Sequence, residues 1–209
     1  MLNEPLAIII AMIGAYLLGS IPSAYIMGKL RKGIDIRQVG SRNMGAMNVF
    51  YNVGFLYGLI VLLMDVGKGA ATIALARWLE VPLPAELIAG VVAVLAHSFP
   101  VWLKFRGGKG GAPLIGVLWF LLPWATPIAF GIFALLTLLT RFPTMSYGIA
   151  LFTYPFVAWL IYHNGTYVLY SSLTLLIPFI RYIPRIKEMY NKSGGMKHFL
   201  VRRNLKDRF

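Results

Sequence analysis

Long apolar runs that carry almost no charge constrain the fold of this sequence more than any other feature. A bilayer crossing needs about 20 consecutive, mainly apolar residues, and this chain has several runs of that kind. Its composition agrees, with 58% hydrophobic and only 13% charged residues, whereas about 25% are charged in typical soluble domains. We therefore predict an all-α, polytopic integral membrane protein.

Seven runs are candidate membrane spans. They cover residues 5–28, 53–79, 83–103, 111–122, 125–139, 146–162 and 166–180. The fourth and fifth runs could form one helix, but Pro123 and Pro127 remove backbone donors and favour a break. The fourth run is short for a full crossing, which is tolerated where protein rather than lipid surrounds it.

The basic residues favour seven spans over six. Lys and Arg concentrate in cytoplasmic loops, and seven spans with the N-terminus outside place all but two of the 20 there. The exceptions are Lys68 and Arg77. A single span over 111–139 would instead put Arg141 and the basic tail outside. We therefore expect seven transmembrane helices, the N-terminus outside and the C-terminus cytoplasmic.

The same basic loops account for the net charge of +13, because they lie beside anionic lipid; we expect no nucleic-acid partner. No internal repeat divides the chain, so we expect one transmembrane domain over 1–183 and a basic cytoplasmic tail over 184–209. The first apolar run has no Lys or Arg before it, unlike a secretory signal peptide, and is expected to be retained. There is no cysteine, which excludes disulfides and thiolate chemistry.

Charged residues inside a span are costly and are candidates for function. Asp65 and Lys68 are three residues apart and share one helical face. Either they form a mutually neutralised pair that locks helix packing, or Lys68 faces a polar cavity open to the cytoplasm and Asp65 orients it. Gly67 and Gly69 favour a close helix approach in the first case.

The segment after the first span, GIDIRQVGSRNMGAMN, contains Ser41, Asn43 and Asn48 among three glycines. Such a loop can expose backbone N–H groups to an anion, although Gly, Ser and Asn also form ordinary turns.

The segment after the third span, FRGGKGGA, places Gly107, Gly108 and Gly110 around Lys109. It is not a Walker A loop, which requires a preceding strand and a following Ser or Thr. Its glycines would still let the backbone approach phosphate oxygens, and Lys109 supplies a point charge. His97, just upstream, is either a general base or a polar residue at a helix end. No HExxH or GxSxG motif supports metal hydrolysis or serine-triad chemistry.

All three polar segments fall on the cytoplasmic side, beside the acyl region of the bilayer. That placement predicts an amphiphilic, phosphorylated substrate. GIDIRQVGSRNMGAMN, MDVGKGA and HSFPVWLKFRGGKGGA, in this order and spacing, resemble the three motifs of the PlsY family, the bacterial acyl-phosphate:glycerol-3-phosphate acyltransferases.

The resemblance implies a multi-pass enzyme of the bacterial cytoplasmic (inner) membrane whose active site faces the cytoplasm. Such an enzyme transfers an acyl group from acyl phosphate to the sn-1 hydroxyl of glycerol 3-phosphate. The products are lysophosphatidic acid and phosphate, in phospholipid biosynthesis. The resemblance also implies that the enzyme needs no metal or other cofactor, contacts membrane lipid and works as a monomer.

Carried over by position, the catalytic candidates are Ser41, Lys109 and His97. Binding candidates in the three motifs are Asn43, Asn48, Asp65, Lys68, Arg106, Gly107, Gly108 and Gly110. Thr144 stands where the family has a serine, and Arg42 and Arg185 are additional arginines that could bind phosphate.

Several positions depart from the family pattern. Arg42 replaces a glycine, Met47 and Pro113 replace threonines, Tyr51 replaces an arginine, Tyr182 replaces a histidine and Arg185 replaces an asparagine. These departures leave open a transferase with another acceptor. A binding or transport protein for an organic phosphate is a further alternative, which the one-sided polar residues and the lack of a repeat disfavour.

Overall fold

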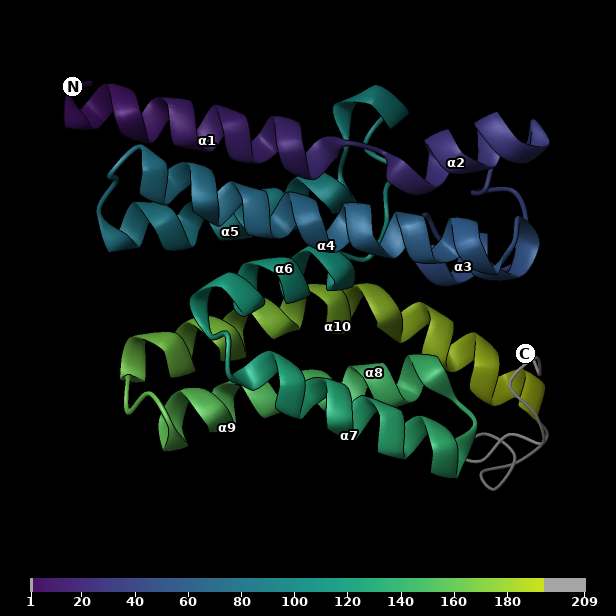
Figure 1. Cartoon of the computed structure of the whole chain (residues 1–209). Helices are drawn as coiled ribbons and strands as arrows, with labels where there is room; N and C mark the ends of the chain where they lie inside the picture. The colour runs from purple at the N-terminus through teal and green to yellow at the C-terminus, as the bar shows by residue number, and fades with distance from the viewer. Residues whose placement is uncertain (1, 194–209) are drawn as a thin grey trace. The chain divides into compact units, whose positions relative to one another are not determined.

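The computed structural model describes residues 2–193, and every regular element in that range is a helix. The α-helices are α1 (Glu4–Ser20), α2 (Ser23–Lys32), α3 (Ala46–Asn52), α4 (Phe55–Trp78), α5 (Leu83–Ser98), α6 (Gly111–Leu121), α7 (Ala125–Thr140), α8 (Pro143–Leu151), α9 (Thr153–Leu160) and α10 (Gly165–Ser193). A short 3₁₀ helix, η1 (Val101–Leu103), follows α5 (Figure 1). The predicted all-α class is confirmed.

The chain divides into two compact units, Met1–Leu121 with α1 to α6 and Leu122–Phe209 with α7 to α10. The division falls at the break expected from the two prolines, since α6 ends at Leu121 and α7 begins at Ala125. Pro123 lies in this break, where its missing N–H costs no helical hydrogen bond.

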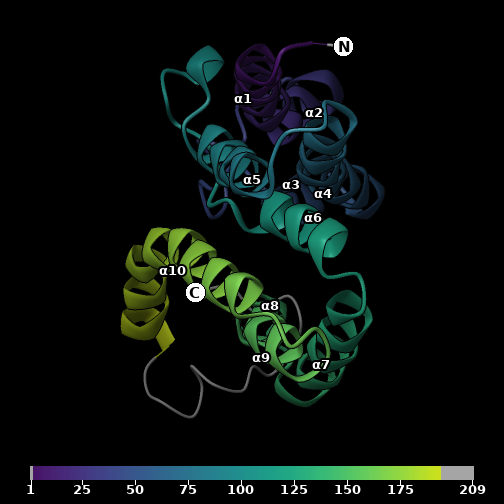
Figure 2. The same cartoon turned by 90° about the vertical axis from the view of Figure 1, so that its left-hand side faces the viewer.

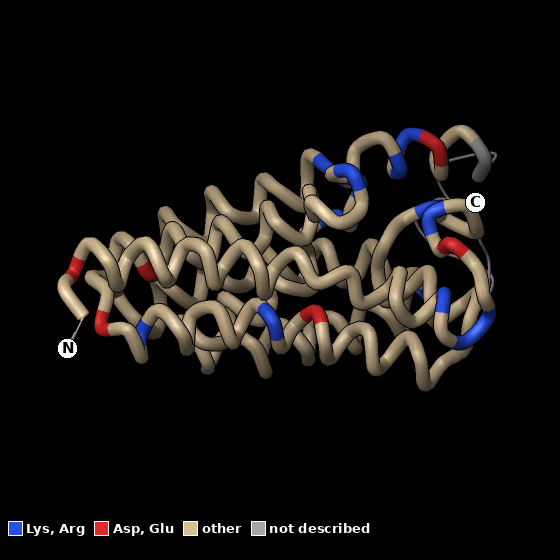
Figure 3. The backbone as a smooth tube through the Cα atoms, turned by 90° about the horizontal axis from the view of Figure 1, so that it is seen from above, with Lys and Arg blue, Asp and Glu red and all other residues tan. Residues whose placement is uncertain are grey.

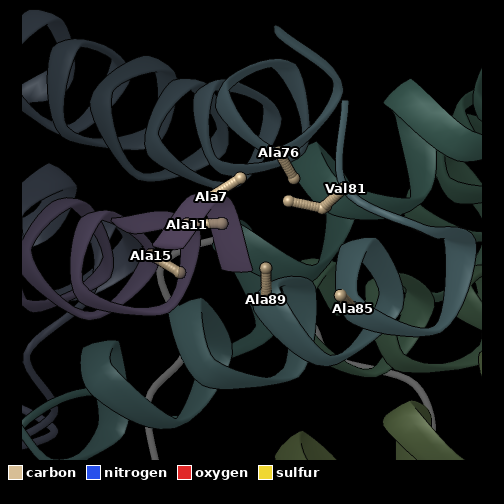
Figure 4. Close-up of a cluster of buried hydrophobic side chains, with 7 residues drawn as sticks. All are labelled: Ala7, Ala11, Ala15, Ala76, Val81, Ala85 and Ala89. Atoms are coloured by element: carbon tan, nitrogen blue, oxygen red, sulfur yellow. The ribbon is translucent and has the colours of Figure 1, made fainter. Parts of the chain in front are cut away.

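Small residues hold the first unit together. In that unit α4 packs against α1, α5 and α6, and α1 packs against α5 (Figure 2). Where α1, α4 and α5 meet, the buried cluster consists of Ala7, Ala11, Ala15, Ala76, Val81, Ala85 and Ala89 (Figure 4). Larger apolar side chains of α1 point outward instead, among them Leu6, Ile9, Ile13 and Leu17. Small residues inside and large ones outside are typical of helices packed in lipid.

Glycines let α4 and α6 approach each other closely. A Cβ atom on Gly116 would lie 1.8 Å from the carbonyl oxygen of Val66, and one on Gly69 would lie 2.0 Å from that of Pro113. The close approach expected at Gly67 and Gly69 is therefore present at Gly69, where the partner is α6, but not at Gly67, where a Cβ atom would meet nothing within 4 Å.

The first predicted span, 5–28, is interrupted. Helix α1 ends at Ser20 and α2 begins at Ser23, with Ile21 and Pro22 between them. Pro22 has no N–H to donate and its ring would clash with the preceding turn. The run still forms one segment long enough to span a membrane, Glu4–Lys32, and the break within it leaves the Ile21 carbonyl available to other groups.

Four helical segments of the described chain are long and apolar enough to cross a membrane: Glu4–Lys32, Phe55–Trp78, Leu83–Leu103 and Gly165–Asn191. Helices α6 and α7 are apolar but shorter. These segments fit an integral membrane protein. Within the first unit, most Lys and Arg lie toward the end of the helices away from the N-terminus (Figure 3), because α2, the loop after it and the α5–α6 loop carry them.

In the second unit, α7 packs against α8 and α9, and α9 packs against α10. The predicted span 146–162 consists of two short helices, α8 and α9, which meet at Phe152. Helix α10 is longer than the predicted span and contains Pro178 and Pro184. The expected start of the tail at residue 184 therefore falls inside a helix, and residues 194–209 lie outside the described range.

Candidate functional site

Asn48 organises the loop that joins α2 to α3. Its side chain is buried, and its Oδ1 accepts hydrogen bonds from the Ser41 backbone N–H at 3.1 Å and from Asn52 Nδ2 at 2.8 Å. Its Nδ2 donates to the backbone carbonyls of Ile36, Val39 and Asn43. These contacts show that the Asn48 amide holds the loop in shape, and its predicted role in substrate binding stays a prediction.

Ser41, Arg42 and Asn43 lie on the segment that Asn48 fixes. Ser41 and Asn43 are half-buried and Arg42 is exposed. Arg42 has a φ of 55°, a left-handed conformation that costs a residue with a Cβ atom roughly 1–2 kcal/mol. Arg42 stands where the PlsY pattern has glycine, and glycine adopts this conformation without that cost.

Arg37 forms an ion pair within this first loop and a hydrogen bond to the segment after α5. Arg37 pairs with Asp35, with Nε 3.0 Å from Oδ1 and Nη2 2.7 Å from Oδ2. Arg37 Nη1 also donates to the Leu103 carbonyl at 3.4 Å. The hydrogen bond from Arg37 holds the pKa of Asp35 below its ordinary value, and the same bond raises the pKa of Arg37. No sequence pattern distinguishes this pair from other loop charges.

Asp65, Lys68 and His97 form a buried polar cluster between α4 and α5. Lys68 Nζ lies 2.8 Å from Asp65 Oδ1 and 2.8 Å from His97 Nδ1. Lys68 Nζ also donates to the Ile21 carbonyl at 2.9 Å, at the α1–α2 break. All three side chains are at most 5% exposed, so the pairing and packing interpretation of Asp65 and Lys68 fits better than a Lys68 that faces an open cavity.

Gly107 and Gly108 pack against the C-terminal end of α5. The Gly107 N–H donates to the Ser98 carbonyl and the Gly108 N–H to the His97 carbonyl, both at 3.1 Å. A Cβ atom on Gly107 would lie 2.1 Å from the His97 carbonyl oxygen, and one on Gly108 would lie 2.1 Å from His97 Nε2. These two N–H groups therefore cap α5, and the glycines are needed because the loop lies so close to His97.

Gly107 and Gly108 belong to the segment that joins α5 to α6, which we call the third loop. The rest of this loop leads into α6. Gly110 has a φ of 85°, and its carbonyl accepts the hydrogen bond of the Leu114 N–H in the first turn of α6. Lys109 is half-buried beside it, and Arg106 is exposed. Lys104 and Phe105 also have positive φ values, 53° and 59°, so this loop holds two residues with side chains in a strained conformation.

Most of the predicted site residues lie in the first unit, on the first loop, α4, the end of α5 and the third loop. The exceptions are Thr144, on α8, and Arg185, on α10, in the second unit. Arg185 Nη1 pairs there with Glu188 Oε2 at 2.5 Å. The sequence reasoning missed the Ile21 carbonyl and Asn52, and only Pro22 signalled the first of these.

Comparison with known proteins agrees with this arrangement. Residues 9–192 match the family model described as glycerol-3-phosphate acyltransferase. A relative from Dehalococcoides mccartyi, glycerol-3-phosphate acyltransferase 2, is 51% identical over 209 residues, covering 99% of this chain and 100% of the relative. The Bacillus subtilis glycerol-3-phosphate acyltransferase is 44% identical over 184 residues, covering 86% of this chain and 92% of the relative.

A solved structure is also similar. The crystal structure of PlsY (YgiH), an integral membrane glycerol 3-phosphate acyltransferase, in its glycerol 3-phosphate form, matches with a TM-score of 0.81 and 28% identity. The match covers 88% of this chain and 92% of that one. This chain belongs to the glycerol-3-phosphate acyltransferase family, the PlsY family of integral membrane enzymes.

Proposed function

We propose that this protein, a glycerol-3-phosphate acyltransferase of phospholipid synthesis by family, uses acyl phosphate as its donor. The acyl group passes to the sn-1 hydroxyl of glycerol 3-phosphate, and lysophosphatidic acid and phosphate are released. The hydroxyl oxygen attacks the acyl carbonyl carbon, the bond from that carbon to the phosphate oxygen breaks, and the hydroxyl proton passes to a phosphate oxygen. Atoms and charges balance without a further reactant.

The observation that carries the proposal is the meeting of the first and third loops. Arg37 bridges from the first loop to the Leu103 carbonyl. The position of a Cβ atom on Gly108 lies 2.1 Å from His97 Nε2 and 2.6 Å from the Met44 carbonyl oxygen. Ser41 and Lys109 therefore belong to loops that contact each other, at the end of the unit where Lys and Arg concentrate.

These residues suit a donor that is already activated. An acyl phosphate needs alignment with the attacking hydroxyl and stabilisation of charge more than it needs a covalent nucleophile. We assign Lys109 to neutralise phosphate charge, with Arg106 and Arg42 at the exposed edge, and Ser41 and Asn43 to hydrogen-bond substrate phosphate.

We further propose seven membrane crossings, with the N-terminus outside and the C-terminus cytoplasmic, in the cytoplasmic (inner) membrane of a bacterium. The short apolar helices α6 and α7 and the α8–α9 pair supply the crossings beyond the four long segments. The basic end of the first unit then faces the cytoplasm. The acyltransferase domain covers 1–183 and works as a monomer, and Thr144, with Arg185 just beyond that domain, binds substrate.

Purified protein in detergent tests the donor and the acceptor together. Acyl phosphate with glycerol 3-phosphate should give lysophosphatidic acid and phosphate in equal amounts, whereas acyl-CoA as donor should give neither. Lys109→Ala should abolish the transfer and leave the protein folded, and Lys29→Met, an exposed lysine on α2, should leave the rate unchanged. Transfer from acyl-CoA alone, or near-normal rates for Lys109→Ala, would overturn the proposal.

A second acceptor is favoured by one specific observation. Arg42 is exposed and has a left-handed backbone conformation where the PlsY pattern has glycine. The loop therefore tolerates a strained backbone at a position that places a cation at the surface. The same assay with a panel of phosphorylated polyols shows whether glycerol 3-phosphate or another polyol phosphate accepts the acyl group faster. If acyl phosphate is consumed with none of them, uptake of glycerol 3-phosphate into proteoliposomes tests the transport alternative.

A further inference from the structure

Three acceptors surround the Lys68 ammonium. They are Asp65 Oδ1 at 2.8 Å, the Ile21 carbonyl at 2.9 Å and His97 Nδ1 at 2.8 Å. A lysine ammonium has three N–H donors and no acceptor. The Ile21 carbonyl takes one N–H, and the Asp65 carboxylate lies at ion-pair distance. Since the ammonium can only donate, His97 Nδ1 must be the acceptor in its contact with Lys68 Nζ.

We propose that Lys68, anchored by Asp65, is a positioning residue that holds His97 as the Nε2–H tautomer. The tautomer of a histidine is set by the hydrogen bond that its other ring nitrogen makes. Asp65 cannot set it directly, because Asp65 Oδ1 lies 3.7 Å from His97 Nδ1, beyond hydrogen-bond distance. Asp65 instead balances the buried charge of Lys68.

The proton on Nε2 faces the two loops. Nε2 lies against Gly108, and the same Cβ position on Gly108 is close to the Met44 carbonyl oxygen of the first loop. His97 thus presents a hydrogen-bond donor at the junction of the first and third loops. An imidazole that carries its proton there cannot take a proton from the acceptor hydroxyl, so His97 is not the general base.

The catalytic role of His97 in this inference rests on the proposed function, whereas its tautomer can be tested without any enzyme activity. If His97 donates a hydrogen bond and Lys68 only positions it, loss of Lys68 should lower kcat and leave the KM for glycerol 3-phosphate nearly unchanged. Lys68 is 5% exposed, too buried to neutralise a bound phosphate. A Lys68 that bound phosphate would instead raise that KM.

The direct experiment is ¹⁵N NMR of the full-length protein labelled at histidine, in detergent. The chain has three histidines, His97, His163 and His198, and His97→Asn assigns the signals of interest. We expect one unprotonated Nδ1 and one protonated Nε2 for His97, independent of any substrate. A protonated Nδ1, or an imidazolium with both nitrogens protonated, would overturn the assignment.

Variants then test the role of Lys68. Lys68→Met leaves the Asp65 carboxylate buried and uncompensated, which can itself unfold a protein, so the double variant Asp65→Asn/Lys68→Met is the main comparison. We expect the His97 signals to shift to a mixture of tautomers and kcat to fall by about 10- to 100-fold, by analogy with the groups that orient metal-bound histidines. His163→Asn, at an exposed position, should change neither kcat nor the His97 signals.

Three outcomes contradict the positioning role. One is an unchanged Nε2–H tautomer in the double variant, which would mean that another group sets it. Another is a large rise in the KM for glycerol 3-phosphate with kcat preserved, which would make Lys68 a binding residue. The third is full kcat despite a tautomer mixture. A wild-type protein that makes no lysophosphatidic acid would instead refute the proposed function, and the NMR measurement would still decide the tautomer.

Discussion

Gly108→Ala is the substitution that most directly tests how the third loop is built. The added Cβ would lie 2.1 Å from His97 Nε2 and 2.6 Å from the Met44 carbonyl oxygen, against an ordinary contact of 3.4–4 Å. His97 cannot simply rotate away, because Lys68 holds its other ring nitrogen at 2.8 Å. Both the imidazole and the first loop must therefore move by about 1 Å, or the third loop must move away from both, to reach ordinary contacts.

The expected cost follows from that displacement. Overpacking a well-packed site typically costs about 1–3 kcal/mol of stability, because neighbours leave their preferred positions. A displacement of about 1 Å at a reacting centre can lower the rate about 100-fold. We therefore expect Gly108→Ala to lower both the thermal midpoint and kcat/KM, with the larger effect on catalysis.

Gly67→Ala is the matched control. Gly67 lies on α4 between Asp65 and Lys68, and a Cβ atom there would meet nothing within 4 Å. Replacing glycine by alanine inside a helix stabilises it by up to about 1 kcal/mol, so this variant should match or exceed the wild-type midpoint and keep full activity. Both variants are compared by thermal unfolding in detergent and by the release of lysophosphatidic acid. If Gly108→Ala behaves like Gly67→Ala in both assays, the packing account of the third loop is wrong.

Three further predictions concern the first loop. Asn48→Ala should lower the stability by a few kcal/mol, since buried hydrogen bonds contribute about 1 kcal/mol each. Asn48→Asp should lower it further, because a carboxylate would then face three carbonyl oxygens. Thermal midpoints equal to that of the wild type would contradict this. Arg42→Gly should raise the thermal midpoint by relieving the positive φ, and should raise the KM for glycerol 3-phosphate if Arg42 binds its phosphate; an unchanged KM excludes that contact. Asp35→Asn should lower the midpoint at pH 7. Because the pKa of Asp35 is lowered in the folded protein, that deficit should start to shrink as the pH falls below about 4 and should be lost as the pH falls through the lower pKa of the folded state. A deficit that does not shrink below about pH 4 would contradict the ion-pair account.

Hydropathy predicted the membrane class and the approximate position of every long helix, because lipid imposes length and composition on a span. It did not predict the interruption at Ile21 and Pro22, since a proline inside an apolar run can sit in a kinked helix or end it. The opposite occurs in α10, which continues through Pro178 and Pro184. Only the packing around each proline decides between these outcomes.

The site was predictable in its residue types and less so in their contacts. Spacing placed Asp65 and Lys68 on one face of a helix, but it could not show that the third partner is His97, 29 positions further along the chain. Likewise an asparagine in a glycine-rich loop is compatible with substrate binding and with loop support. The five hydrogen bonds of the Asn48 side chain involve backbone groups from Ile36 to Asn43 and the side chain of Asn52, and no local pattern encodes that set.

The glycines of the third loop show that a motif can predict a function correctly while the contacts predicted for its backbone groups are wrong. A glycine beside a lysine suggests backbone N–H groups directed at phosphate, yet the Gly107 and Gly108 N–H groups donate to carbonyls of α5. The glycines let the loop lie against His97, and Gly108 lies beside the Met44 carbonyl of the first loop. If Lys109 and His97 act as proposed, this packing fixes their positions, and an activated donor requires such alignment more than it requires a nucleophile. Substitutions at Gly107 and Gly108 should therefore impair transfer through displacement of Lys109 and His97, rather than through loss of phosphate hydrogen bonds.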